Sequence, residues 1–184
     1  MTRSFQAHRL NVQAFAEQGA SLAETTLLQN MQRLAEEAQG LQPDMLVKWQ
    51  AHGELRSASG GTGAEGDVWL RLEAQASIPL TCQRCMGPVL TPLEVDHWYR
   101  FVATEDIAMA EDDQSEEDLL VMEPQFDLLA VLEDELLMAL PLVPMHDECP
   151  AAPVMRAGEG APAGETEGKP NPFAVLSGLK KKSG

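Results

Sequence analysis

The stretch VWLRLEAQASIPL, residues 68–80, determines the expected fold more than any other part of the chain. Apolar side chains occupy its even-numbered positions, from Val68 to Leu80, and mostly polar ones occupy the odd-numbered positions. Successive side chains of a β-strand point to opposite faces of a sheet, so alternation over this length is typical of a strand with one buried face.

Neighbouring stretches extend this strand into a sheet. Residues 89–101 repeat the alternation, and the short connection 82–88 between the two stretches predicts a hairpin. Residues 45–55 predict a further strand, followed by a glycine-rich turn at 59–63. Strands joined by short links usually pair, so we expect an antiparallel sheet, which could curl toward a partial barrel.

Two helices are expected to pack on this sheet. Ser21 and Glu24 form a capping-box pattern before leucines at helical spacing, which predicts an amphipathic helix over 22–38. Asp127 can cap a second helix that runs to Leu140 before Pro141 ends it. Its apolar face is expected to carry Leu129, Leu132, Leu136 and Leu140, with an exposed polar face at 133–135. The fold class is therefore α+β.

The remaining segments divide the chain. We expect a single α+β domain over residues 1–149, within which 104–118 is a mobile acidic loop because 105–118 holds eight carboxylates and no Lys or Arg. We expect a short strand after it, at 119–122. Residues 150–172 are rich in Pro, Gly and Ala, which predicts a flexible linker. Residues 173–184 predict a short C-terminal helix with a basic end.

The charge of the chain constrains its partners. The formal net charge is −16, from 29 acidic and 13 basic residues, and residues 101–155 hold 15 carboxylates with no Lys or Arg. Proteins grip nucleic-acid phosphates by replacing counterions with Lys and Arg, so extended RNA binding is disfavoured. A basic protein is the more natural partner, since opposite fields steer association. The candidate contacts are Glu111, Asp112, Asp113, Glu116, Glu117 and Asp118.

Three cysteines and a histidine form the clearest candidate metal site. Cys82-x-x-Cys85 and His146-x-x-Cys149 together supply the four ligands that a tetrahedral zinc ion takes. About sixty residues separate the pairs, so ordinary reduced cysteines beside an exposed histidine remain the alternative. Thioredoxin-like redox chemistry is disfavoured because no helix follows the motif. Arg84 could bind a carboxylate or phosphate, or be a solvent-facing turn residue.

Signatures of catalysis are lacking. The sequence has no GxxxxGK[ST], GxGxxG, GxSxG or HExxH pattern, and its four histidines are scattered. We therefore expect no enzymatic activity and no small-molecule substrate. The N-terminus lacks an apolar secretory segment, and the longest apolar run, 136–145, is about half the length of a membrane span. The expected location is the cytoplasm, without membrane contact.

Three separated motifs occur in an order that closely resembles the proteobacterial YceD-like family of large ribosomal RNA subunit accumulation proteins. They are Cys82–Cys85 after an alternating strand, the segment 126–146, and residues 169–176 followed by a lysine cluster. The likeness covers roughly residues 67–184. More distant relatives carry further CxxC pairs after the Pro-x-x-His segment, where this chain has only Cys149, which weakens the transfer of a complete metal site.

The resemblance implies an assembly factor for synthesis, processing or stability of 23S ribosomal RNA, with no known catalytic residues. The first hypothesis is that the protein acts by binding basic ribosomal proteins or pre-50S particles, and that it contacts ribosomal RNA only indirectly. Direct binding of precursor RNA is the second, because Trp69, Arg71, Arg84, Trp98 and Arg100 mix aromatic and cationic side chains. A zinc or thiol redox protein is the least favoured.

Overall fold

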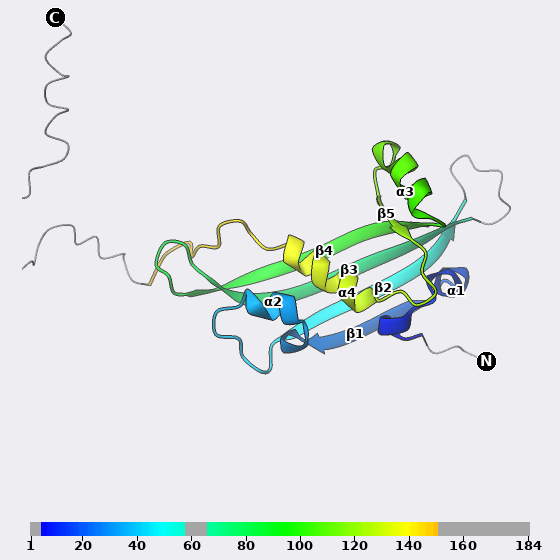
Figure 1. Ribbon diagram of the computed structural model, residues 1–184. Coiled ribbons are helices and arrows are strands. Elements are labelled where there is room, and N and C mark those ends of the chain that lie inside the picture. Colours follow the sequence, from blue (N-terminus) through cyan, green and yellow to red (C-terminus); the bar gives the residue numbers. More distant parts are fainter. Residues whose placement is uncertain (1–4, 58–65, 151–184) are drawn as a thin grey trace, which may run out of the picture. The chain divides into compact units, whose positions relative to one another are not determined.

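A five-stranded mixed sheet forms the centre of the computed structural model, which describes residues 5–57 and 66–150 (Figure 1). The strands lie in the order of the sequence. They are β1 (Ser21–Leu27), β2 (Leu46–Arg56), β3 (Asp67–Thr81), β4 (Pro88–Val102) and β5 (Asp118–Val121). The α+β class is confirmed, as are the strands expected at 45–55, 68–80 and 89–101 and the hairpin between the last two. Over the described residues the sheet stays open, with β1 and β5 at its edges.

Pairing is antiparallel from β1 to β4, whereas β5 is parallel to β4. The expected short strand at 119–122 is thus present, in an orientation that the purely antiparallel prediction did not include. A parallel pair needs a crossover between its strands, and here residues 103–117 provide it. The acidic segment, residues 105–118, is therefore part of the fold.

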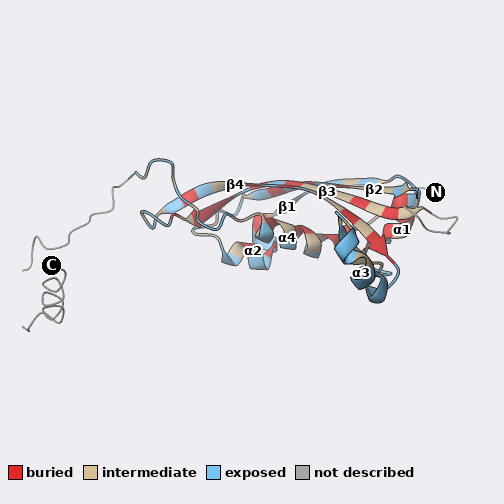
Figure 2. Cartoon of the chain, turned by 90° about the horizontal axis from the view of Figure 1, so that it is seen from above, coloured by how far each residue is buried: buried red, intermediate tan, exposed pale blue. Residues whose placement is uncertain are grey.

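Helices cover one face of the sheet (Figures 1 and 2). They are α1 (Val12–Glu17), α2 (Gln32–Glu36) and α4 (Leu128–Met138), with 3-10 turns at Ala7–Arg9 and Leu28–Asn30. Helix α3 (Glu105–Glu111), with a 3-10 turn at Asp112–Gln114, lies at the β5 edge and buries none of its residues (Figure 1). The inward side chains of β3, among them Leu70, Leu72 and Ile78, are buried under this layer. In the part of the chain that the structure describes, none of the helices has the length and apolar character of a membrane span.

The helix expected at 22–38 is wrong over its first half. Ser21–Leu27 is strand β1, paired along its whole length with β2, and only Gln32–Glu36 is α-helical. Ser21 contacts Nδ1 of His52 at 2.9 Å instead of capping a helix, and the Thr26 hydroxyl accepts a hydrogen bond from Trp49 at 3.0 Å. Pairing with the long β2 strand outweighs the weak helical preference of the Glu-Thr-Thr run.

The acidic segment is also more ordered than the expected loop. Thr104 Oγ1 accepts from the Ile107 backbone N–H at 3.4 Å and begins α3, and Glu105 and Asp106 lie in its first turn, where negative charge favours a helix. Arg100 of β4 donates to Glu117 at 2.9 Å and to Glu111 at 2.8 Å. A cation from the neighbouring strand therefore offsets part of the repulsion that predicted a mobile loop.

Helix α4 matches the helix expected after Asp127. The Asp127 carboxylate accepts from the backbone N–H groups of Leu129 and Ala130, at 3.0 and 3.2 Å. Leu128, Leu132 and Leu136 are the fully buried positions, so the apolar face is shifted from the one expected, and Leu129 and Leu140 are only partly buried. Each fully buried leucine contributes roughly 1.5–3 kcal/mol of hydrophobic free energy. The linker at 150–172 lies, but for Pro150, outside the described residues, and so does the helix expected at 173–184.

Candidate functional site

The loop between β3 and β4 lies against the segment that follows α4. Inside the loop, the Cys82 N–H donates to the Gly87 carbonyl and the Met86 N–H donates to the Cys82 carbonyl, both at 2.9 Å. Met86 adopts a left-handed backbone conformation, with φ of 60°. The Gln83 N–H donates to the Pro144 carbonyl at 2.9 Å. This last bond holds Pro144, at the start of the segment 144–149, beside the tip of the hairpin.

All four candidate metal ligands meet at this point. One ligand atom from each of Cys82, Cys85, His146 and Cys149 lies within 4.8 Å of the others. Cys82 Sγ is 3.9 Å from Cys149 Sγ, and Cys85 Sγ is 3.5 Å from His146 Nδ1. Nε2 of His146 is 3.1 Å from the Pro88 carbonyl oxygen. We call these four residues the Cys/His cluster.

The cysteines of the cluster have different surroundings. Burial favours a raised thiol pKa for Cys82, but hydrogen bonds from the backbone of Cys85, His146 and Arg84, together with the His146 side chain, outweigh it and lower the pKa to about 5. Burial raises the pKa of Cys149 to about 11, and the neighbouring sulfurs of Cys85 and Cys82 add to this effect. The loop thus favours thiolate at Cys82, the form in which cysteine binds metals.

The structure divides the predicted partner-binding carboxylates into two groups. Glu111 and Glu117 pair with Arg100, and Asp118 lies 3.0 Å from His97. No described residue forms a side-chain hydrogen bond or ion pair with Asp112, Asp113 or Glu116. Arg84 is exposed at the hairpin tip, and its guanidinium likewise pairs with no described residue.

A second histidine cluster was not predicted from the sequence. His97 of β4 places Nε2 at 3.0 Å from Asp118 of β5 and Nδ1 at 3.7 Å from Glu135 of α4. The two carboxylates face different ring nitrogens, and one ligand atom from each of the three residues lies within 4.8 Å of the others. The ring stacks on Tyr99, whose pKa is raised by burial and by the nearby carboxylates Glu135 and Asp118. The sequence signal that could have found it is the alternating pattern of β4, which puts His97 on the inward face of the strand.

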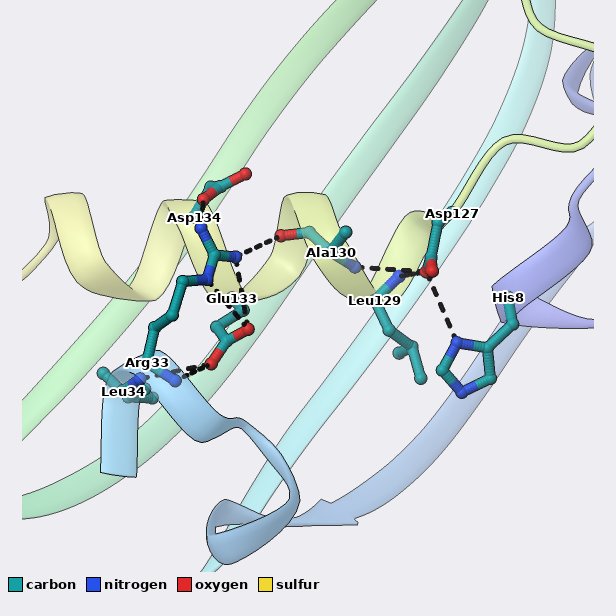
Figure 3. A network of polar contacts seen from close by, with 8 residues as sticks. All are labelled: His8, Arg33, Leu34, Asp127, Leu129, Ala130, Glu133 and Asp134. Carbon is teal, nitrogen blue, oxygen red and sulfur yellow. Dashed lines mark hydrogen bonds and ion pairs between the residues drawn. The ribbon is translucent and has the colours of Figure 1, made fainter. Parts of the chain in front are cut away.

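Glu133 belongs to a polar junction and not to a purely exposed face (Figure 3). Its carboxylate accepts from the backbone N–H groups of Arg33 and Leu34, at 2.8 and 3.1 Å, in the first turn of α2. The Arg33 guanidinium also pairs with Glu133 and with Asp134. The expectation of a solvent-facing stretch at 133–135 is therefore wrong for Glu133, which joins α4 to α2, and for Glu135, whose side chain is only 17% exposed beside His97.

Aromatic and cationic side chains gather on the sheet face that the described helices leave open. The Arg56 guanidinium lies 4.1 Å from the ring centroid of Trp69 and 4.0 Å from that of Trp98. Arg71, on the same face, pairs with Asp96 and Glu73. A hollow on this face is lined by one basic side chain, Lys48, and by Glu73, Glu94 and Asp96.

Comparison with known proteins gives a family. Residues 70–180 match the family model described as large ribosomal RNA subunit accumulation protein YceD. A protein of that name from Haemophilus influenzae is 39% identical over 124 residues, which make up 62% of this chain and 67% of the relative. No solved structure matches. The family is named for accumulation of the large ribosomal RNA subunit and not for a reaction. By the extent of both matches, the chain belongs to the YceD family.

Proposed function

We propose that this protein supports 23S ribosomal RNA accumulation without catalysis, by using its acidic segment to hold basic ribosomal proteins during assembly in the cytoplasm. The observation that carries the proposal is the placement of Asp112, Asp113 and Glu116, which have no side-chain partner among the described residues. A partner that brings lysines or arginines to these carboxylates displaces no internal ion pair.

The paired carboxylates of the acidic segment hold in place those that have no partner among the described residues. Arg100 is only 15% exposed and binds Glu111 and Glu117, so it fixes both ends of the 111–117 stretch against β4. A preorganised array of charges loses less conformational entropy on binding than a flexible one does. The net charge of −16 adds long-range attraction for a basic partner, which raises the association rate at low salt.

The test measures binding of the full chain to isolated basic ribosomal proteins at low and high salt. A triple variant, Asp112→Asn, Asp113→Asn and Glu116→Gln, is expected to bind about tenfold more weakly at low salt, equivalent to ~1.4 kcal/mol. The difference in affinity between the wild type and the triple variant is expected to narrow at high salt, because screening shortens the range of each charge.

A matched control makes the same change of charge elsewhere. Glu24→Gln, Glu36→Gln and Glu37→Gln alter exposed carboxylates of β1, α2 and the residue after α2. This control is expected to bind nearly as the wild type does. Absence of binding at low salt, or an equal loss in the control, contradicts the proposal.

Direct binding of precursor RNA is the second candidate function, favoured by Trp69 and Trp98 on the open sheet face. Bases stack on such rings, and arginines can contact phosphates. However, Arg71 and Arg100 are already paired with carboxylates, and the nearby hollow is mainly acidic. A filter-binding titration with precursor fragments separates the two functions, because a protein-only role predicts no retention of RNA.

A further inference from the structure

We propose that Cys82, Cys85, His146 and Cys149 bind one Zn²⁺ ion as a structural site that ties the β3–β4 hairpin tip to the segment after α4. This inference is independent of the proposed function, because it concerns stability of the fold and not the partner. Three thiols and one imidazole are a donor set that structural zinc sites use, and four protein ligands leave no coordination position open for catalysis.

The spacing of the donor atoms fits a tetrahedron. With Zn–S bonds of about 2.3 Å and Zn–N bonds of about 2.0 Å, tetrahedral angles place sulfurs about 3.8 Å apart and a sulfur about 3.5 Å from a nitrogen. The distance from Cys82 Sγ to Cys149 Sγ is 3.9 Å, and that from Cys85 Sγ to His146 Nδ1 is 3.5 Å. Two opposite edges of the tetrahedron, which together use all four ligands, therefore already have the required lengths.

The orientation of His146 matches that of a metal ligand. Its Nε2 is 3.1 Å from the Pro88 carbonyl oxygen, which can only accept a hydrogen bond, so Nε2 carries the proton. In the neutral ring Nδ1 then keeps its lone pair, and this is the atom that faces Cys85 Sγ. Metal-binding histidines commonly have their other nitrogen fixed in this way by a carbonyl or carboxylate.

A disulfide accounts for less of the arrangement. A bond between Cys82 and Cys149 would use the 3.9 Å pair but would leave the contact between Cys85 and His146 unexplained. Binding of one ion explains both contacts. The ion would also cross-link two segments that are about sixty residues apart in sequence.

The first test is the zinc content of the full chain, purified under reducing conditions and measured by mass spectrometry of the elements. We expect one zinc per chain in the wild type and in His8→Gln, which changes a histidine outside the cluster. His146→Gln and Cys149→Ser are expected to lose most of the metal. Wild-type zinc no higher than that of Cys149→Ser, or stoichiometric iron in its place, overturns the proposal.

A second measurement does not depend on variants that fold. Replacement of zinc by Co²⁺ in the wild-type chain is expected to give the visible absorption of a tetrahedral cobalt–thiolate centre. A thiol reagent is expected to label the three cysteines slowly until a chelator is added, and rapidly afterwards. Octahedral cobalt spectra, or thiol labelling that the chelator does not change, count against the site.

Discussion

At the scale of single residues, the best-defined ion pair on the open sheet face joins Arg71 to Asp96. Arg71 Nε and one terminal nitrogen donate to the two oxygens of Asp96 at 2.9 and 2.8 Å. These hydrogen bonds hold the pKa of the Asp96 carboxyl below its ordinary value. The folded chain therefore takes up this proton at lower pH than the unfolded chain does.

This pair makes stability depend on pH. Its contribution is fully present above the unfolded pKa, about 3.9, and is lost as the pH falls through the lower folded value. Because Asp96 is 58% exposed, we expect Asp96→Asn to lower the free energy of unfolding by only about 0.5 kcal/mol at pH 7, and by less at about pH 3, which lies below the unfolded pKa. Urea titrations at both pH values measure it.

Glu94→Gln is the control for that prediction. Glu94 is exposed on the same strand, and no described residue forms an ion pair with it. Its substitution is expected to leave the free energy of unfolding nearly unchanged at either pH. A gap for Asp96→Asn that persists in acid would show that packing, and not the carboxylate charge, is responsible.

Residue types and spacing made Cys82, Cys85, His146 and Cys149 candidates for one site. They could not show that the two pairs meet, because about sixty residues separate Cys85 from His146. The contact between the Pro88 carbonyl and His146 could not be predicted, because every residue has a backbone carbonyl and the sequence does not show which one faces the histidine. Arg100 could not be identified as the counterion of Glu111 and Glu117, because it lies on β4, outside the acidic segment, and only the fold brings it to them.

At the scale of elements, Glu133 explains how α2, a helix of five residues, is held in place. Such a short helix is marginal by itself, because nucleation costs more than a few backbone hydrogen bonds return. The Glu133 carboxylate satisfies two N–H groups of its first turn from α4 (Figure 3). We expect Glu133→Ala to lower the free energy of unfolding by about 1–2 kcal/mol.

Asp134→Asn separates this capping role from charge alone. Asp134 also pairs with Arg33, but it is 54% exposed and receives no backbone hydrogen bond from α2. Its substitution is expected to change stability little, since exposed ion pairs contribute little. Thermal and urea unfolding of both variants check the prediction. An equal loss in the two would mean that α2 is held by the ion pairs and not by the cap.

Elements with long periodic patterns were predicted well, and the short ones were not. β3 and α4 each carry several turns or repeats of one period, so local pattern and tertiary packing agree. The stretch from Ser21 to Glu36 satisfies helical spacing with its leucines, yet it divides into a strand, a turn and a short helix. Ser21–Leu27 forms a strand because it pairs with β2, which lies further along the chain, and the local sequence pattern does not indicate this pairing.

At the scale of the whole molecule, a net charge of −16 opposes the compact state. Folding brings the carboxylates closer together, and the ion pairs that arginines form among the described residues offset this repulsion only in part. Salt shortens the screening length from about 30 Å at 0.01 M to about 8 Å at 0.15 M. Long-range repulsion is then reduced more than close ion pairs are.

We therefore expect the free energy of unfolding to rise by about 1 kcal/mol when sodium chloride increases from 0.01 to 0.15 M. The triple variant of Asp112, Asp113 and Glu116 removes three negative charges and no ion pair among the described residues, so its stability should rise less with salt. Urea unfolding at both concentrations measures the difference. If salt instead destabilises the wild type, close ion pairs outweigh the net repulsion, and the acidic segment adds less strain to the fold than its charge indicates.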